Sequence, residues 1–156
     1  VRRLLQREED LKEYYSSVLS AFELDDGHFL HKEDKSFFEK MMQIIDSHIQ
    51  NTDLSVELLS SSLGYSTRQF YRKLKNVTEK TPADIIREYR LTIVERLLLT
   101  TQLSIEEIMD KTGFSNRGTF YKAFAQKFEM TPKQYRNIKT KDVHEASEEG
   151  GGTMNV

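Results

Sequence analysis

The chain has 156 residues, 37% of them hydrophobic, which is enough for one domain or two very small ones with a real core. It contains no cysteine, so disulfides and thiolate zinc sites are excluded, and a reducing cytoplasmic location is expected. The sequence shows no apolar run as long as a membrane span and no secretory signal, so no membrane contact is expected. Because it starts at Val, we interpret it as a fragment of a longer protein.

The formal net charge is −2, but the charged side chains are distributed unevenly along the chain. Residues 1–65 carry 7 basic and 13 acidic side chains, and residues 140–156 carry 1 and 4. Residues 66–139 carry 15 basic and 8 acidic side chains, a net charge of +7. A basic segment between acidic ones indicates nucleic acid as the partner.

The chain opens with a candidate amphipathic helix over residues 1 to about 22. Its apolar side chains follow a three-to-four spacing that Glu8 interrupts: Val1, Leu4, Leu11, Tyr15, Val18 and Phe22. Two interpretations fit this pattern equally well, a short coiled coil or connector and a helix packed on its own domain. In the loop that follows, His28 and His31 lack the further ligands that a metal site needs, so we expect neither metal nor cofactor.

A second helix is expected from Glu33 to Ile49, with one apolar side and with His48 packed or half exposed. A turn follows at residues 51–53, and the stretch from Ser55 to Pro82 then predicts a helix-turn-helix. Its first helix runs over about residues 56–63, and Gly64 stands where a positive φ costs least.

The second helix of this motif begins with a capping-box pattern, Ser66 followed three places later by Gln69. Its apolar stripe consists of Phe70, Leu74 and Val77, and its opposite, basic stripe consists of Arg68, Arg72 and Lys75, with Tyr71 beside it. No acidic residue interrupts the basic stripe. A solvated surface face would look similar, but the same pattern recurs later in the chain, which favours a helix that enters a DNA major groove.

A long helix is expected over residues 83–99, with Thr81 as its cap and Pro82 at its first position. Arg87 and Arg90 lie on this helix. Two roles fit them equally well, contact with DNA phosphates and exposed ion pairs with the neighbouring glutamates.

The helix-turn-helix pattern returns 49 residues later, which indicates one structural unit used twice. Gly113-Phe114-Ser115 corresponds to residues 64–66. The second copy then has one extra residue, after which Phe120-Tyr121-Lys122 corresponds to residues 70–72.

The second copy begins at another capping-box pattern, Ser104 with Glu107. Its recognition helix is expected over residues 117–128, with a core stripe of Phe120, Phe124 and Phe128. A last helix starts at Thr131, which Gln134 helps to cap, and ends near residue 138.

The stretch from about residue 36 to 138 resembles the DNA-binding domain of the AraC/XylS family of bacterial transcription regulators. The resemblance is carried by Gly113-Phe114-Ser115, Phe120-Tyr121-Lys122-Ala123-Phe124 and Met130-Thr131-Pro132-Lys133-Gln134-Tyr135-Arg136. It implies an all-α fold of two helix-turn-helix subdomains joined by a long linker helix, about seven helices plus an N-terminal connector helix. It also implies that the linker helix holds both recognition helices toward one face of the DNA, about one helical turn, ~34 Å, apart. Ser60 and Met109 depart from the family, which usually has a small Ala at both positions.

These patterns define the candidate site. We expect base edges to be read by Arg68, Tyr71, Arg72, Arg117, Thr119 and Lys122, since arginine favours guanine O6 and N7 and a tyrosine or threonine can touch a thymine methyl. We expect phosphates to be contacted by Ser66, Thr67, Lys73, Lys75, Ser115 and Asn116. No phosphate-binding glycine loop and no nucleophile–histidine–acid set is present in the sequence, so no enzyme is expected and no catalytic residue is assigned.

The predicted function is a sequence-specific transcription regulator domain that binds double-stranded DNA. The domains are expected at 1–32 (connector helix and loop), 33–138 (DNA-binding domain, divided at 33–80, 81–100 and 101–138) and 139–156 (disordered tail). The N-terminal stretch looks like the connector that follows a receiver domain in hybrid two-component regulators. Receiver or sensor domains are therefore expected upstream of it. A homodimer is expected to form through residues 1–22 or through those upstream domains. Two alternatives remain, a helical protein-interaction module and a non-specific architectural DNA binder.

Overall fold

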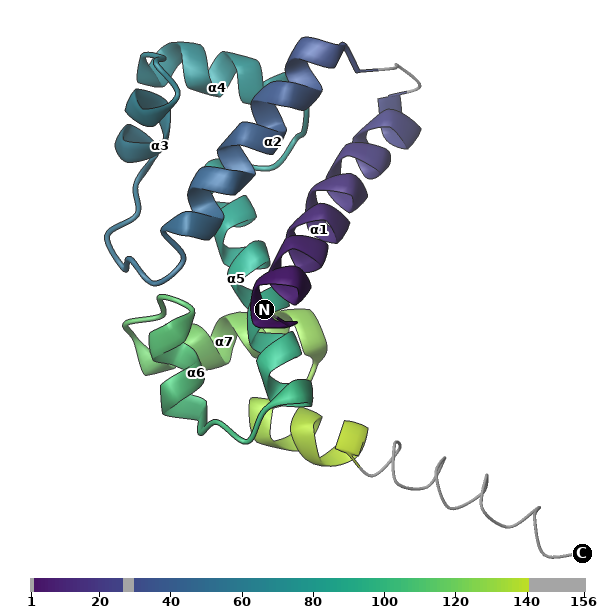
Figure 1. Ribbon diagram of the computed structural model, residues 1–156, viewed down its shortest axis with the longest axis vertical. Coiled ribbons are helices and arrows are strands. Elements are labelled where there is room, and N and C mark those ends of the chain that lie inside the picture. Colours follow the sequence, from purple (N-terminus) through teal and green to yellow (C-terminus); the bar gives the residue numbers. More distant parts are fainter. Residues whose placement is uncertain (1, 27–29, 141–156) are drawn as a thin grey trace, which may run out of the picture. The chain divides into compact units, whose positions relative to one another are not determined.

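The computed structural model describes the backbone of residues 2–26 and 30–140 and the side chains of residues 8–20 and 30–140. Within these ranges the chain forms eight helices and no strand, as the sequence predicted (Figure 1). They are α1 (Arg2–Asp26), α2 (Lys32–Ser47), α3 (Val56–Ser62), α4 (Thr67–Lys75), α5 (Pro82–Thr100), α6 (Ile105–Lys111), α7 (Arg117–Phe128) and a last helix over 132–140. None of the described helices is long and apolar enough to span a membrane. His28 and most of the predicted tail lie outside the described residues.

The chain divides into two compact units, residues 1–92 and residues 93–156. Each unit contains one helix-turn-helix, α3–α4 in the first and α6–α7 in the second. Helix α5 is continuous and contributes residues to both units.

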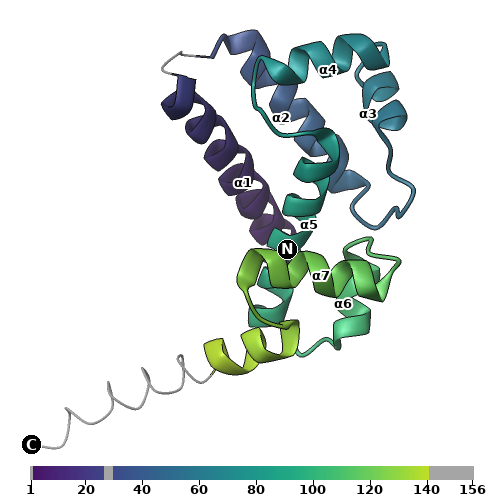
Figure 2. The same cartoon turned by 180° about the vertical axis from the view of Figure 1, so that it is seen from behind.

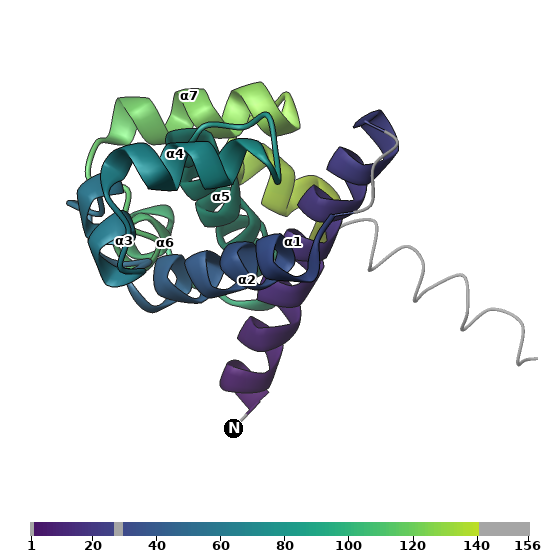
Figure 3. The same cartoon turned by 90° about the horizontal axis from the view of Figure 1, so that it is seen from above.

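Helix α2 lies at the centre of the first unit, between α1 on one side and the α3–α4 pair on the other (Figures 1 and 2; Figure 3 shows the pair from above). Its buried side chains are Phe37, Phe38, Met41, Met42 and Ile45. Tyr89 of α5 is fully buried, and its hydroxyl donates to Asp46 Oδ1 at 2.6 Å. The predicted apolar face of α2 therefore forms the core of this unit.

Helix α1 packs on its own unit, which was one of the two interpretations of its pattern. Its buried apolar side chains are Leu11, Tyr14 and Val18. The Tyr14 ring lies 5.5 Å from the Tyr89 ring, and its hydroxyl donates to Glu88 Oε2 at 3.0 Å. Burial raises the pKa of the Tyr14 hydroxyl well above its usual range, so it remains a neutral donor. The prediction of Tyr15 as the tyrosine of this stripe was wrong: Tyr14 is buried and its hydroxyl has a partner on α5, whereas Tyr15 is only half-buried.

Each helix-turn-helix turns at a glycine with a left-handed backbone conformation. Gly64 and Gly113 both have φ of +79°, as predicted. The residue after each glycine donates its N–H to the carbonyl five residues earlier, at 2.9 Å for Tyr65 and 3.0 Å for Phe114. This bond is the mark of a Schellman motif, which satisfies the carbonyls at the end of the first helix.

The replacement Gly64→Val should lower the free energy of unfolding by about 1–2 kcal/mol, because a side chain at this φ crowds its own backbone. A Cβ at Gly64 would meet no heavy atom within 4 Å, so the cost is conformational rather than a clash. Gly64→Asn is the control and should lose less, because asparagine tolerates the left-handed region. Urea unfolding measures both. Equal losses for the two variants, or no loss in Gly64→Val, would contradict the assignment.

The departures from the family pattern are both accommodated in the core. Ser60 in α3 is 2% exposed and donates its hydroxyl to the Glu57 carbonyl at 3.2 Å, and Met109 in α6 is 8% exposed. Each stands on the first helix of its motif, where its side chain faces the interior of its own unit.

The second unit is built around aromatic side chains. Phe120 and Phe124 of α7 are fully buried, as predicted, whereas Phe128 is only half-buried and stacks at 4.4 Å on Phe124. Tyr135 packs edge-on against Phe124 at 5.7 Å, and its hydroxyl donates to the carboxylate of Glu95 on α5. Burial and this hydrogen bond raise the pKa of Tyr135 to about 12.

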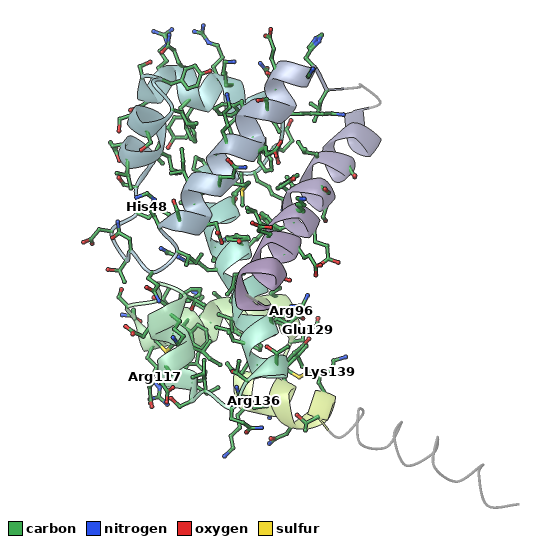
Figure 4. The ribbon with its side chains drawn as sticks, in the orientation of Figure 1. His48, Arg96, Arg117, Glu129, Arg136 and Lys139 are labelled. Carbon is green, nitrogen blue, oxygen red and sulfur yellow. The ribbon has the colours of Figure 1, made fainter. Side chains whose placement is uncertain are left out.

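Arg136 ties the last helix to the end of α5 (Figure 4). Its guanidinium donates to the carbonyl oxygens of Leu98 at 3.0 Å, Leu103 at 2.7 Å and Thr101 at 3.4 Å. The last carbonyls of a helix have no partner within it, so this arginine satisfies that of Leu98 from outside, and it binds two more carbonyls in the loop after α5.

Candidate nucleic-acid interface

Local sequence fixes which face of α4 is exposed. Ser66 Oγ accepts from the Gln69 N–H at 3.2 Å and Gln69 Oε1 accepts from the Ser66 N–H at 3.0 Å, so the predicted capping box is complete. Phe70 and Leu74 are buried at 0% and 2% exposure. With the helix start and the buried face both fixed, the opposite basic stripe points to solvent.

Most predicted contact residues of α4 and its cap are exposed: Ser66, Thr67, Arg68, Tyr71, Arg72 and Lys75. Tyr71 is 44% exposed and is held edge-on against Phe70 at 6.2 Å. Here the exposed aromatic ring lies within a helix face of uniform positive charge.

Lys73 differs from the other predicted contacts because it is half-buried. Its ammonium lies 5.3 Å from the Tyr65 ring centroid and 5.7 Å from that of Phe37, within cation–π range of both. It lines a groove of about 450 Å³ between the start of α2 and α4. The ammonium is thus held at the flank of α4, where it helps to seat the helix on α2.

Helix α7 starts at Arg117, as the sequence predicted. Asn116, not Ser115, is its N-cap, and Asn116 Oδ1 accepts from the Thr119 N–H at 2.9 Å. The extra residue of the second motif therefore lies in the turn. Counted from the caps, Arg117 takes the place of Thr67, and Gly118 takes the place of Arg68. We call α4 and α7, each with its cap, the first and second heads. The two heads present different side chains at the same helical positions.

Arg117, the first residue of α7 and labelled in Figure 4, contacts two side chains of the second unit, Glu106 and Tyr121. Its Nη1 donates to Glu106 Oε1 at 2.8 Å, and its guanidinium carbon lies 5.3 Å from the Tyr121 ring centroid. The paired side chains are 64% and 72% exposed. The sequence analysis did not single out Glu106, although an acid in the first turn of α6 and an arginine at the first position of α7 were usable signals.

The remaining predicted residues of the second head, Ser115, Thr119 and Lys122, are exposed. Thr119 and Lys122 are three residues apart and so share one helix face. Lys122 stands at the position of Arg72 in the first head when both helices are counted from their caps. Both heads therefore carry a cation at the same place.

Arg87 and Arg90 of α5 do not pair with Glu88 or Glu95, which was one of the two roles considered for them. Arg87 pairs with Asp84 at 2.6 Å, and this hydrogen bond holds the pKa of the Asp84 carboxyl below its usual value. Arg90 is half-buried and donates to the Asn51 carbonyl at 2.7 Å, so it fastens the turn after α2. Burial lowers its pKa.

Two helix-turn-helix motifs, each with a capped second helix and a basic exposed face, define a class of DNA-binding domain. The model of a family described as "Helix-turn-helix domain" matches residues 59–138, about half of the chain. The chain belongs to this family and is an AraC-type DNA-binding domain of a transcription regulator.

Similar proteins agree with this assignment. The chain is 30% identical over 103 residues to the regulatory protein SoxS of Escherichia coli strain K12, a match that covers 66% of this chain and 95% of SoxS. It is 34% identical over 104 residues to histidine kinase P4 of Formosa agariphila, covering 67% of this chain but only 8% of that protein. A solved structure, the C-terminal domain of AraT, a response regulator from Geobacillus stearothermophilus, is similar with a TM-score of 0.61 and 26% identity over 65% of this chain and 84% of that one.

Proposed function

We propose that the domain recognises DNA sequence through two unlike heads, α4 and α7. Base edges are read by Arg68, Tyr71, Arg72, Arg117, Thr119 and Lys122, and phosphates are contacted by Ser66, Thr67, Lys73, Lys75, Ser115 and Asn116. The observation that carries this proposal is the exposed basic face of α4, which has a buried apolar stripe behind it and no acidic residue in the helix. On such a face, the paired N–H donors of an arginine match the O6 and N7 acceptors of guanine in the major groove, and an exposed tyrosine ring can touch the methyl group of thymine.

One monomer should occupy an asymmetric site. The exposed residues differ between the heads, with an arginine in the first where the second has Gly118. Operator symmetry mirrors protein symmetry, so two different heads favour two different half-sites, which we place in successive major grooves about one helical turn, ~34 Å, apart.

We propose that the full-length protein is a two-component regulator, with receiver or sensor domains before a connector at 1–32 and the DNA-binding domain at 33–138. Two similarities support this: one relative is a histidine kinase and one similar structure is a domain of a response regulator. A DNA-binding output of this kind acts in the cytoplasm.

We place any self-association in the proposed upstream domains. The part of α1 with described side chains, residues 8–20, is the less suitable surface, because Leu11, Tyr14 and Val18 are buried within their own unit. A dimer formed upstream would raise the effective concentration of the domain at two neighbouring sites.

Competition binding tests the sequence-specific function. The domain should stay bound to a site selected from random DNA when unrelated competitor is added, because specific sites are typically about 10³–10⁷ times tighter than non-specific DNA. Binding that depends only on duplex length and salt would indicate an architectural role. Absence of binding to any duplex would indicate a protein-interaction module.

A further inference from the structure

The ion pair between Glu106 and Arg117 has no counterpart in the first motif. Glu57 stands at the position of Glu106, two residues after the serine that caps the first helix. The first residue of α4, however, is Thr67, so the first motif has no arginine at the position of Arg117. The second motif therefore differs from the first in two ways. It has one extra residue in its turn, and it has an arginine and an acid that contact each other at 2.8 Å.

We propose that Glu106 is a specificity-determining residue of the second head, which limits binding to non-cognate DNA by occupying one edge of Arg117. This inference rests on the proposed DNA-reading role of Arg117. The carboxylate neutralises the cation at the start of α7, while the Tyr121 ring supports the flat side of the guanidinium.

The geometry of the guanidinium explains how one acid can act on specificity rather than on affinity alone. Arginine has five N–H donors in a rigid fork, and Glu106 uses only Nη1. The edge formed by Nη2 and Nε keeps the two parallel donors that a guanine O6/N7 pair needs. The sole other contact of this edge among the described residues is a long one, 3.5 Å, from Nη2 to the Tyr121 hydroxyl.

A DNA phosphate offers the arginine no comparable gain. Moving Arg117 onto a phosphate exchanges one anion for another and leaves the Glu106 carboxylate exposed beside a second negative charge. Non-specific binding depends on cations that replace counterions at phosphates, so a cation neutralised in this way contributes little to it. A guanine edge, by contrast, is read while the ion pair stays intact.

The test is the affinity of the 156-residue protein for two duplexes, the site selected from random DNA and an unrelated sequence, at salt concentrations from about 50 to 200 mM. Glu106→Gln should raise affinity for the unrelated duplex about threefold or more and steepen its salt slope by about 0.9, because one additional cation becomes available to phosphate. The ratio of specific to non-specific affinity should fall by a similar factor.

Two matched controls change the net charge equally. Glu107→Gln lies in the same first turn of α6, and Glu57→Gln lies at the equivalent place in α3, and neither residue pairs with an arginine in the described part of the chain. Both should alter the ratio much less than Glu106→Gln does. Thermal unfolding of all three variants checks that the helices are intact.

The double variant Glu106→Gln with Arg117→Ala decides whether the pair is responsible. Without Arg117, the change at Glu106 should have no more effect than the change at Glu107. Equal effects of all three glutamine variants, or an effect of Glu106→Gln that persists in the double variant, would overturn the inference while leaving the proposed function in place. A wild-type protein that does not discriminate between the two duplexes would overturn the proposed function itself, and this inference with it.

Discussion

Replacing Phe70 with Ala is expected to lower the free energy of unfolding by about 3–5 kcal/mol, because it leaves a cavity in the first unit. Phe70 is fully buried, and its ring meets the Phe37 ring edge-on at 5.7 Å. Domains of this size are stable by only about 5–15 kcal/mol, so the variant should lose much of its cooperative unfolding transition. Urea unfolding followed by circular dichroism measures the loss.

The neighbouring residue is the control for this prediction. Tyr71 is 44% exposed, so Tyr71→Ala should change stability by less than about 1 kcal/mol while it weakens DNA binding. Phe70→Leu should retain more stability than Phe70→Ala, because it fills part of the cavity. A loss of stability at Tyr71 as large as that at Phe70 would show that the buried and exposed faces of α4 are wrongly assigned.

Arg72→Ala is expected to reduce affinity for the selected DNA site by about 1–3 kcal/mol and to relax discrimination at one or two base pairs. Arg72 is exposed, and the cap and apolar stripe of α4 fix the face on which it lies. The measurement is the affinity of wild type and variant for the selected site and for its single-base variants.

Lys75→Ala provides the comparison, because Lys75 is an exposed cation of the same helix assigned to phosphate. It should weaken binding to all sequences about equally and reduce the salt slope by about 0.9. Lys73 is a poorer control, since its ammonium also packs over two aromatic rings. If Arg72→Ala weakens every duplex to the same extent, Arg72 does not read a base.

The elements that could be predicted from sequence are those with local signals. Helix α7 was predicted at its observed bounds, 117–128, because its stripe repeats at helical spacing. The capping serine and glutamine at the start of α4 and the two glycines at φ +79° lie within a few residues of the structure that they specify. For the same reason the exposed face of α4 could be predicted almost completely.

The features that sequence reasoning missed depend on contacts between distant residues. Tyr14 was overlooked because its partner, Glu88, lies 74 residues away, and Arg90 was assigned to the surface because its partner, Asn51, lies 39 residues away. No periodicity in one helix reveals which residue on another helix it meets.

The start of α7 shows a different limit. Ser115 and Asn116 are adjacent, and both residue types are good N-caps, so cap chemistry alone does not choose between them. The structure selects Asn116, and this choice places Arg117 at the first helical position beside Glu106. One residue in the turn thus decides which side chains the second head presents.

Selection of binding sites from a random double-stranded DNA library tests the central claim most directly. The two heads differ in the residues that they expose and in the length of the turn before the cap, so we predict one asymmetric consensus with two unlike blocks about 10 base pairs apart, each sensitive to mutations in only one of α4 and α7. A consensus with two-fold symmetry within a single footprint, or a selected pool no different from the starting library, would contradict it.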